Sequence, residues 1–332
     1  MLRPYPIPAT SLTIPASRAV TALAALVALA AFVSACRRGQ TASIRHEIEH
    51  GGRTRAYYVH LPPDSANGKP LPVVLNFHGG GGDAQGQERY SGMDAVADEE
   101  GFIAVYPDGT GRFGERLLTW NAGGCCGSAQ DEAVDDVGFV RALIADLSAV
   151  TPIDRSRIYA TGLSNGAMMS YRLGAEAGDL IAAIAPVAGA MTLESFAPAR
   201  PLSILHIHSV DDPRALYDGG IGPPFPLTNR RVEHQPVESV LAQWATFDGC
   251  PSEPAEAERM EGPPGTDQTA TLWVYSPCSD GVEVALWKLT GVGHVWPGGA
   301  PDYLKRILGP STSIIDANRE MWAFFPRFAL PR

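Results

Sequence analysis

A serine lies at the centre of a pattern with small residues on both sides. Residues 162–166 read Gly-Leu-Ser-Asn-Gly, which matches G-x-S-x-G. A strand-like run, Arg157–Thr161, precedes the pattern, and a helical run, Asn165–Leu173, follows it. A serine on such a turn is held above the end of a sheet, where the helix N-terminus favours developing negative charge. We therefore expect Ser164 to be a nucleophile. The alternative is a glycine-rich turn with only a structural role.

A serine hydroxyl needs a general base, and on this type of turn the histidine comes last along the chain, after an acid. His294 lies in a glycine-rich loop, 291–299, directly after the last predicted strand, so it is the candidate base. His206 and His208 alternate along an earlier strand and precede any acid, which fits structural roles. His234 follows two arginines in a polar loop and is expected to be solvated.

The acid should follow the predicted strand Ser203–His208, because it has to accept the histidine N–H and fix the tautomer. Asp211, Asp212 and Asp218 lie there, and Asp212 is the preferred candidate with Asp211 second. Aspartates in a loop also form turns, which is the structural alternative.

A tetrahedral intermediate needs preset backbone N–H groups. One is expected from Asn165, which follows the serine, and the other from Gly79 or Gly80 in the His-Gly-Gly-Gly-Gly-Asp loop at 78–83. This loop follows a buried strand and has the HGGG form. The rival interpretation is a phosphate-binding loop, but no Gly-Lys-Ser/Thr follows it.

These loops must be held by regular elements. Strand patterns alternate with helical ones after an opening hairpin, which predicts an α/β fold with a mostly parallel sheet and helices on both faces. The predicted strands are Ile44–Glu49, Thr54–Leu61, Leu71–Phe77, Phe102–Tyr106, Ile158–Thr161, Ile181–Val187, Ser203–His208, Thr271–Tyr275 and Val282–Leu289. The predicted helices are Met93–Glu100, Val137–Val150, Asn165–Leu173, Val237–Phe247 and Ile314–Phe325. The Pro/Gly-rich stretches Gly219–Pro226 and Pro251–Gly265 read as loops, so 44–332 is expected to be one catalytic domain.

Composition excludes several classes of protein. The chain has 332 residues, 45% hydrophobic and 19% charged, which is enough apolar side chain for a large core and excludes intrinsic disorder. The net charge is −10 and the basic residues are not clustered, so nucleic acid is not an expected partner.

The N-terminal segment indicates export. Arg3 and Arg18 come before the uncharged apolar run Ala19–Val33, which is short for a membrane span and fits a signal peptide over 1–35. Val-Ser-Ala before Cys36 resembles a lipobox, so Cys36 is a lipidation candidate and 36–43 would be a tether. An ordinary signal peptide cut near Ala35 is the alternative. In both cases the mature chain is extracytoplasmic, secreted or anchored to the membrane only by lipid.

Four cysteines remain in the mature chain, an even number in an oxidising compartment. Three pairings are formally possible. Their positions favour Cys250 with Cys278, which leaves Cys125 and Cys126 as adjacent thiols or a vicinal bridge. None of the spacings suits a metal site.

Together these segments resemble a secreted family of the α/β-hydrolase fold, the polyhydroxybutyrate depolymerases and feruloyl esterases, close to carbohydrate esterase family one. The resemblance covers about Arg55 to Gly299. It is carried by 76–83, 105–109, 119–127 (Thr-Trp-Asn-Ala-Gly, then Cys-Cys-Gly), 134–139, the serine turn, 248–250 and 293–298.

The resemblance implies a serine carboxylic ester hydrolase without cofactor, with the triad Ser164, Asp212 and His294, and it supports the Cys250–Cys278 bridge. It implies a small or polymeric ester as substrate: short-chain, hydroxycinnamoyl or polyhydroxyalkanoate. Candidate substrate contacts are Trp120, Trp296 and His78; for the tryptophans a core or rim position is the alternative. The chain departs from the family where Ser209 follows His208 and Leu216 precedes Tyr217.

Three other functions remain to be weighed. An acyltransferase or a serine peptidase would use the same fold and triad, but no extra gating domain of the peptidase kind fits the chain. A non-enzymatic surface module would require a vestigial triad. The short segment Ala188–Pro201 leaves no room for a large lid, so an open groove shaped by Gly219–Pro226 and short or bulky acyl groups are expected.

Overall fold

A computed structural model of the protein describes residues 42–225, 229–301 and 303–331. The predicted signal segment and Cys36 lie outside the described residues. In the described part of the chain, no helix is long and apolar enough to cross a membrane. Residues Ser43–Arg332 form one compact unit by their contacts.

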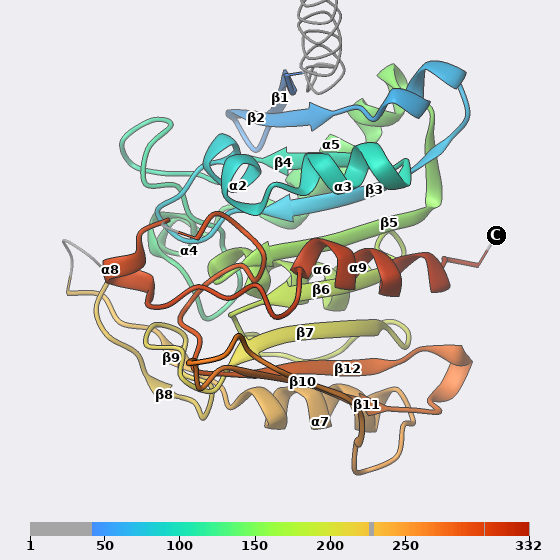
Figure 1. The fold of residues 1–332 in the computed structure, drawn as a ribbon. Helices are drawn as coiled ribbons and strands as arrows, with labels where there is room; N and C mark the ends of the chain where they lie inside the picture. The colour runs from blue at the N-terminus through green and yellow to red at the C-terminus, as the bar shows by residue number, and fades with distance from the viewer. Residues whose placement is uncertain (1–41, 226–228, 302, 332) are drawn as a thin grey trace, which may run out of the picture. The chain divides into compact units, whose positions relative to one another are not determined.

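The core is a ten-stranded sheet in the order β1-β2-β4-β3-β5-β6-β7-β12-β11-β10 (Figure 1). Its six central strands, β4 to β12 in that order, run parallel, and antiparallel hairpins extend both edges. The strands are β1 Ile44–His50, β2 Arg53–His60, β3 Leu71–Phe77, β4 Ile103–Pro107, β5 Ile153–Leu163, β6 Ala183–Val187, β7 Ser203–Ser209, β10 Ala255–Glu261, β11 Thr269–Tyr275 and β12 Val284–Thr290. A separate short pair consists of β8 Gly220–Ile221 and β9 Glu233–His234.

The central strands are apolar along their length because both faces of the sheet are covered. In β3, the side chains of Val73, Leu75 and Phe77 enter one hydrophobic cluster and that of Val74 enters another. The first cluster includes residues of α5, α6 and α7, and the second includes residues of α2, α3 and α9. The mostly parallel α/β sheet with helices on both faces is therefore confirmed.

The five predicted helices, which correspond to α3, α5, α6, α7 and α9, begin and end close to the predicted bounds. The helices of the structure are α2 Ala84–Ser91, α3 Met93–Glu100, α4 Gly127–Asp131, α5 Asp136–Val150, α6 Asn165–Glu176, α7 Val237–Phe247, α8 Lys305–Leu308 and α9 Ala317–Phe324, with 3₁₀ turns η1 Pro63–Asn67, η2 Ser279–Gly281 and η3 Phe325–Arg327. Asp135 caps α5 by accepting the N–H of Gly138 at 2.8 Å.

The structure differs from the sequence prediction at several elements. The helices α2, α4 and α8 and the short strands β8 and β9 were not predicted, and β8 lies in Gly219–Pro226, which was expected to be a loop. Helix α2 was not expected, because its sequence is mostly polar; Asp83 starts it by capping the N–H of Gly86 at 2.7 Å. Pro251–Gly265 was expected to be a loop but contains β10. This edge strand is exposed on nearly every residue, so it shows no apolar alternation.

The parallel strands bring distant segments to one edge of the sheet. The loops after β3, β5, β7 and β12 all leave from carboxyl ends, and these are the loops that carry His78–Gly82, Ser164, Asp212 and His294. Ligands of such sheets bind at this edge.

Candidate active site

Ser164 lies on a strained turn between β5 and α6. Its φ of 58° and ψ of −116° are unusual for a non-glycine residue and mark a sharp change of direction. The flanking glycines are required by close packing: a Cβ on Gly162 would lie 2.5 Å from the carbonyl oxygen of Phe77, and one on Gly166 would lie 2.7 Å from that of His78. The serine is thus held at the N-terminus of α6.

Asp212 reaches His294 across the loops after β7 and β12. Nδ1 of His294 donates to Oδ2 of Asp212 at 2.7 Å, and both side chains are buried. Oδ1 accepts the backbone N–H groups of Arg214 at 2.7 Å and Ala215 at 2.8 Å. Burial opposes ionisation of this carboxyl, but His294 and the hydrogen bonds of His208 and His294 outweigh burial and hold the pKa of Asp212 well below its ordinary value.

Asp211 points elsewhere. Its Oδ2 accepts the backbone N–H of Gly291 at 2.6 Å, which ties the loop after β7 to the loop that carries His294. Of the two neighbouring aspartates, only Asp212 contacts the imidazole in the structure.

The glycine loop lies directly beside the serine. A Cβ on Gly79 would be 3.5 Å from Cβ of Ser164, and one on Gly80 would be 3.7 Å from Cβ of Asn165. The N–H of Gly81 donates to Leu118 and that of Gly82 donates to Gly79. Within the described residues the N–H groups of Gly79 and Gly80 have no such hydrogen bond, so they can donate to a bound group.

His78 holds this loop rather than projecting from it. Its ring is buried, Nδ1 contacts the carbonyl of Gly79 at 2.8 Å, and Nε2 accepts the N–H of Gly109 at 3.0 Å. Burial lowers the pKa of His78 to about 4, which keeps the ring neutral. The ring also borders the cavity on the glycine-loop side of Ser164.

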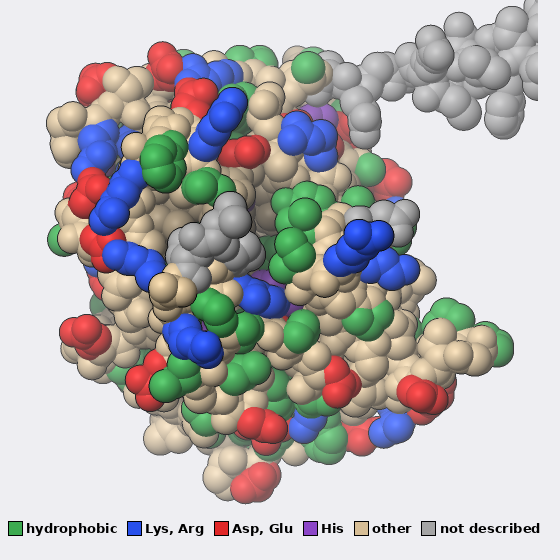
Figure 2. All heavy atoms as spheres, turned by 90° about the vertical axis from the view of Figure 1, so that its left-hand side faces the viewer, with side chains coloured by type: hydrophobic (Ala, Val, Ile, Leu, Met, Phe, Trp, Pro, Cys, Tyr) green, Lys and Arg blue, Asp and Glu red, His purple; other side chains and the backbone are tan. Residues whose placement is uncertain are grey.

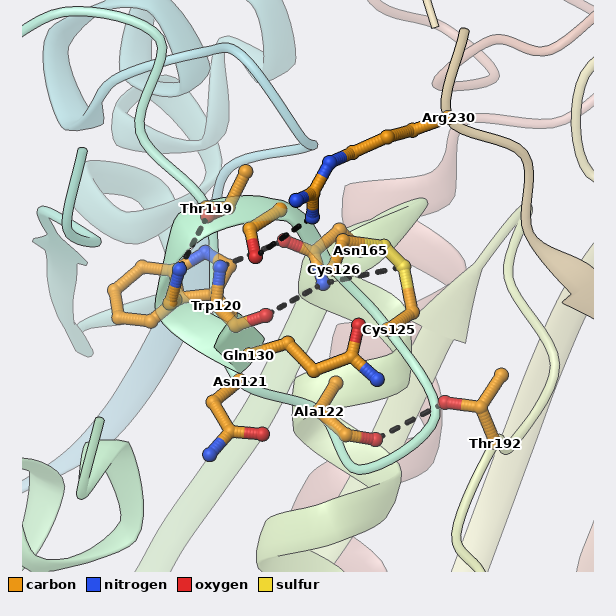
Figure 3. The surroundings of a disulfide bond; sticks show 12 residues. Thr119, Trp120, Asn121, Ala122, Cys125, Cys126, Gln130, Asn165, Thr192 and Arg230 are labelled. Atoms are coloured by element: carbon orange, nitrogen blue, oxygen red, sulfur yellow. Dashed lines mark hydrogen bonds between the residues drawn. A yellow bond between two sulfur atoms is a disulfide. The ribbon is translucent and has the colours of Figure 1, made fainter. Parts of the chain in front are cut away.

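Figure 3 shows that Asn165 is fixed by the loop that contains Trp120 and the cysteine pair. The N–H of Trp120 donates to Oδ1 of Asn165 at 2.7 Å, and Nδ2 of Asn165 donates back to the carbonyl of Trp120 at 3.0 Å. The indole N–H of Trp120 donates to the carbonyl of His78 at 3.0 Å. Trp120 therefore connects both strand ends expected to supply oxyanion donors.

The two tryptophans named as substrate contacts are placed differently from that expectation. Trp120 is 0% exposed and Trp296 is 1% exposed, and the indole of Trp296 donates to Asn318 at 3.1 Å. Neither residue lines the cavities next to Ser164. Both indoles pack in the interior because their N–H groups find internal acceptors.

Two cavities of about 130 Å³ each meet at Ser164 and His294. The walls of one include the glycine loop and Tyr90. The other is mostly apolar, and its walls include Cys125, Cys126, Met168, Phe225, Leu304 and Ile307. Figure 2 looks onto this face of the molecule and shows it hollowed, with apolar side chains around the depression. Two separate spaces therefore adjoin Ser164 and His294.

Three further histidines lie near the site. His206 and His208 are buried on β7, as structural roles predict. His234 was expected to be solvated, but it is only 7% exposed and lines the apolar cavity. It lies in β9, which pairs with β8, and a Cβ on Gly222 would lie 2.7 Å from its Nε2. Burial lowers its pKa to about 4. Its neighbours in the sequence, Glu233 and Gln235, are polar, so the sequence gave no signal that His234 is buried.

The four described cysteines lie in two pairs. Cys250 and Cys278 are at disulfide distance, with Cα atoms 4.0 Å apart, and connect the end of α7 to the turn before β12. Cys125 and Cys126 are also paired, next to Asn165 (Figure 3).

Comparison with known proteins identifies the family. The family model described as esterase PHB depolymerase matches residues 55–249. The chain belongs to this family. It is 31% identical to NocK of Nocardia uniformis subsp. tsuyamanensis, a protein named as a candidate esterase, over 79% of this chain and 76% of that protein. It is 30% identical to feruloyl esterase B of Piromyces equi over 77% of this chain but only 46% of that longer protein.

The fold comparison agrees. The acetyl xylan esterase from Aspergillus awamori superposes with a TM-score of 0.54 at 15% identity, over 86% of this chain and 99% of that one. This member of the PHB depolymerase family is thus an esterase with the α/β-hydrolase fold.

Proposed function

We propose that the protein hydrolyses carboxylic esters with Ser164 as nucleophile, His294 as general base and Asp212 as its acid partner. The 2.7 Å contact between Asp212 and His294, at the cavity that Ser164 lines, is the observation that carries the proposal. The carboxylate fixes the imidazole with its proton on Nδ1, which leaves Nε2 free to accept a proton.

The reaction proceeds in two halves. Oγ of Ser164 attacks the ester carbonyl carbon while Nε2 of His294 takes its proton, and the N–H groups of Asn165 and of Gly79 or Gly80 bind the oxyanion. The ester C–O bond breaks as His294 returns the proton to the leaving alcohol. Water then attacks the acyl-enzyme while His294 takes a proton from it; the bond between the acyl carbon and Oγ of Ser164 breaks as His294 gives that proton to Oγ, and the acid leaves.

The small cavities and the family support short-chain, hydroxycinnamoyl or hydroxyalkanoate esters as substrates. The N-terminal sequence supports an extracytoplasmic enzyme, with Cys36 as lipid anchor. Radioactive palmitate should label the full-length protein and not Cys36→Ala. A mature N-terminus without lipid would indicate plain secretion.

The test of the nucleophile combines turnover and labelling. Wild-type protein should hydrolyse p-nitrophenyl butyrate and gain one organophosphonate group on Ser164, as read by peptide mass. Ser164→Ala should lose both, with a rate loss on the order of 10⁶-fold. Retention of a tenth of the rate, or labelling of another serine, would contradict the assignment.

A further inference from the structure

Three buried side chains continue the hydrogen bonds beyond the carboxylate of Asp212. The hydroxyl of Tyr171 lies 3.0 Å from Nδ1 of His206, and Nε2 of His206 lies 3.0 Å from Nδ1 of His208. Nε2 of His208 lies 2.8 Å from the carbonyl of Ala215 and 3.3 Å from Oδ2 of Asp212. Tyr171 comes from α6 and both histidines come from β7, and each of the three is at most 1% exposed.

For a neutral His208, the direction of these hydrogen bonds follows from the last partner. The carbonyl of Ala215 and the carboxylate only accept, so Nε2 of His208 carries a proton. A neutral imidazole has one N–H, so Nδ1 of His208 accepts from Nε2–H of His206. Nδ1 of His206 then accepts the hydroxyl proton of Tyr171. Every donor in the chain points toward Asp212.

Burial favours the neutral forms of His206 and Tyr171. It lowers the pKa of His206 well below its ordinary value and raises that of Tyr171, so neither group is charged. The described residues contain no group of three or more His, Cys, Asp or Glu side chains that could hold a metal ion.

We propose that Tyr171, His206 and His208 are positioning residues, which deliver an N–H to Oδ2 of Asp212 and so set the orientation and basicity of the carboxylate that holds His294. This inference rests on the proposed function. It adds a fourth donor to the three that Asp212 receives from Arg214, Ala215 and His294.

The surroundings of His208 single out this contact. The ring of Tyr217 packs edge-on against His208 with centroids 5.7 Å apart, and Lys288, which lies over Tyr217, is paired with Glu238 at 2.7 Å. His234 lies on the cavity side, near Asp212 and His294. Of these groups, His208 is the one that shares Oδ2 with His294.

The first test compares two replacements of His208: Leu, whose side chain has no N–H donor, and Gln, whose side chain has one. In His208→Leu the carboxylate loses an N–H, so more negative charge stays on Oδ2 and the imidazolium form of His294 is favoured. We expect a ten- to hundred-fold lower kcat, a KM within twofold, and half-maximal kcat/KM at a pH higher by about half a unit or more. His208→Gln keeps an amide N–H near the position of Nε2. It should restore most of the wild-type kcat and most of the wild-type pH profile. Wild-type pH profiles in both variants would overturn the proposal.

The second test removes only a hydroxyl and decides the question if His208→Leu does not fold. Tyr171→Phe should shift the pH profile in the same direction by a smaller amount. Tyr159→Phe is the matched control, because Tyr159 is equally buried and its hydroxyl donates to a carbonyl, that of Phe328, at 2.9 Å. It should lower the melting temperature to a similar extent without moving the profile. Identical pH profiles for the two variants would contradict the proposed series of hydrogen bonds from Tyr171 to Asp212.

A third measurement does not depend on activity. Nitrogen-15 spectra of histidine-labelled protein, assigned with the variants, should show the Nε2–H tautomer at His206 and His208. A proton on Nδ1 of neutral His208 would overturn the proposal. Expected tautomers in a wild-type protein that turns over no ester would contradict the proposed function instead, and would leave the hydrogen-bond chain in place.

Discussion

Trp120 and Asn165 exchange two hydrogen bonds, from the backbone N–H of Trp120 to Oδ1 of Asn165 at 2.7 Å and from Nδ2 of Asn165 to the carbonyl of Trp120 at 3.0 Å. The indole of Trp120 also reaches the carbonyl of His78. One buried residue therefore sets the spacing between the glycine loop and the start of α6, from which the oxyanion donors are expected.

Trp120→Phe should lower kcat about tenfold with little change in KM. The phenyl ring fills most of the space but loses the N–H to His78, so the donors move relative to the oxyanion and transition-state stabilisation falls. Steady-state kinetics on p-nitrophenyl butyrate measure this. Trp287→Phe is the control, because Trp287 is also buried and its indole donates to Glu320, outside the site. Equal losses of kcat in the two variants would refute the positioning role of Trp120.

Asp212→Asn should lower kcat by about 10⁴-fold, because an amide favours the wrong tautomer of His294. Asp211→Asn should cost less than tenfold, because the amide oxygen can still accept the N–H of Gly291. Parallel measurement of kcat for the two variants tests the assignment. A larger loss in Asp211→Asn would transfer the acid role to it.

The activity should rise with pH through one deprotonation step. The pKa of Asp212 is held well below its ordinary value, so its carboxylate stays ionised throughout the working range. The remaining group is the imidazole base, which acts only when neutral, and imidazole ordinarily titrates at about 6.5. The measurement is kcat/KM from pH 4.5 to 9. A profile that rises in two separate steps would contradict control by a single group.

Much of the site was predictable because it depends on local sequence. The G-x-S-x-G turn, the glycine loop and the final histidine loop each follow a buried strand, and parallel pairing brings the strand ends together without further information. The choice of Asp212 over Asp211 could be ranked but not decided, since one residue of difference in a turn reverses which carboxylate points inward.

Other features depend on contacts distant in sequence. The hydrogen bond between Tyr171 and His206 joins residues 35 positions apart, and no pattern in the sequence around either residue predicts it. Only the alternation of His206 and His208 along one strand placed these two on a common face. Likewise the polar sequences of α2 and β10 gave no apolar period, because one element depends on its cap and the other lies at an exposed edge.

The free energy of unfolding should decrease as the pH rises toward neutrality, because one buried carboxyl group, that of Asp248, then loses its proton. Asp248 is 0% exposed, and burial raises its pKa to about 7 although the N–H of Leu202 donates to it. An acid with a raised folded-state pKa stabilises the fold below its unfolded value of about 3.9 and loses that contribution as the pH passes through the folded value.

Asp248→Asn should therefore raise the free energy of unfolding at pH 8 by about 2 kcal/mol and change it little at pH 4. Urea melts at both pH values measure this. A variant that is less stable than wild type at pH 8 would show that the charged carboxyl is stabilised in the fold.

Cys250 and Cys278 should be recovered in one cross-linked peptide from the unreduced protein, because the structure places them at disulfide distance. Closing this loop should contribute about 3.6 kcal/mol by chain entropy, so Cys250→Ser with Cys278→Ser should melt at a lower temperature. Recovery of Cys250 joined to Cys125 or Cys126 would contradict the pairing.

Short acyl groups should be preferred over long ones. Residues 188–202, all within the described chain, contain no helix that would form a lid, and each cavity beside Ser164 has a volume of about 130 Å³. A sixteen-carbon chain would have to leave the apolar cavity across the exposed side chains of Leu304 and Ile307. We expect good kcat/KM for acetate, butyrate, methyl ferulate or a hydroxybutyrate oligomer, and poor kcat/KM for palmitate. Leu304→Ala with Ile307→Ala should widen the cavity and narrow that difference, whereas Leu117→Ala, exposed but outside both cavities, should not. A wild-type preference for palmitate would overturn the open-groove interpretation.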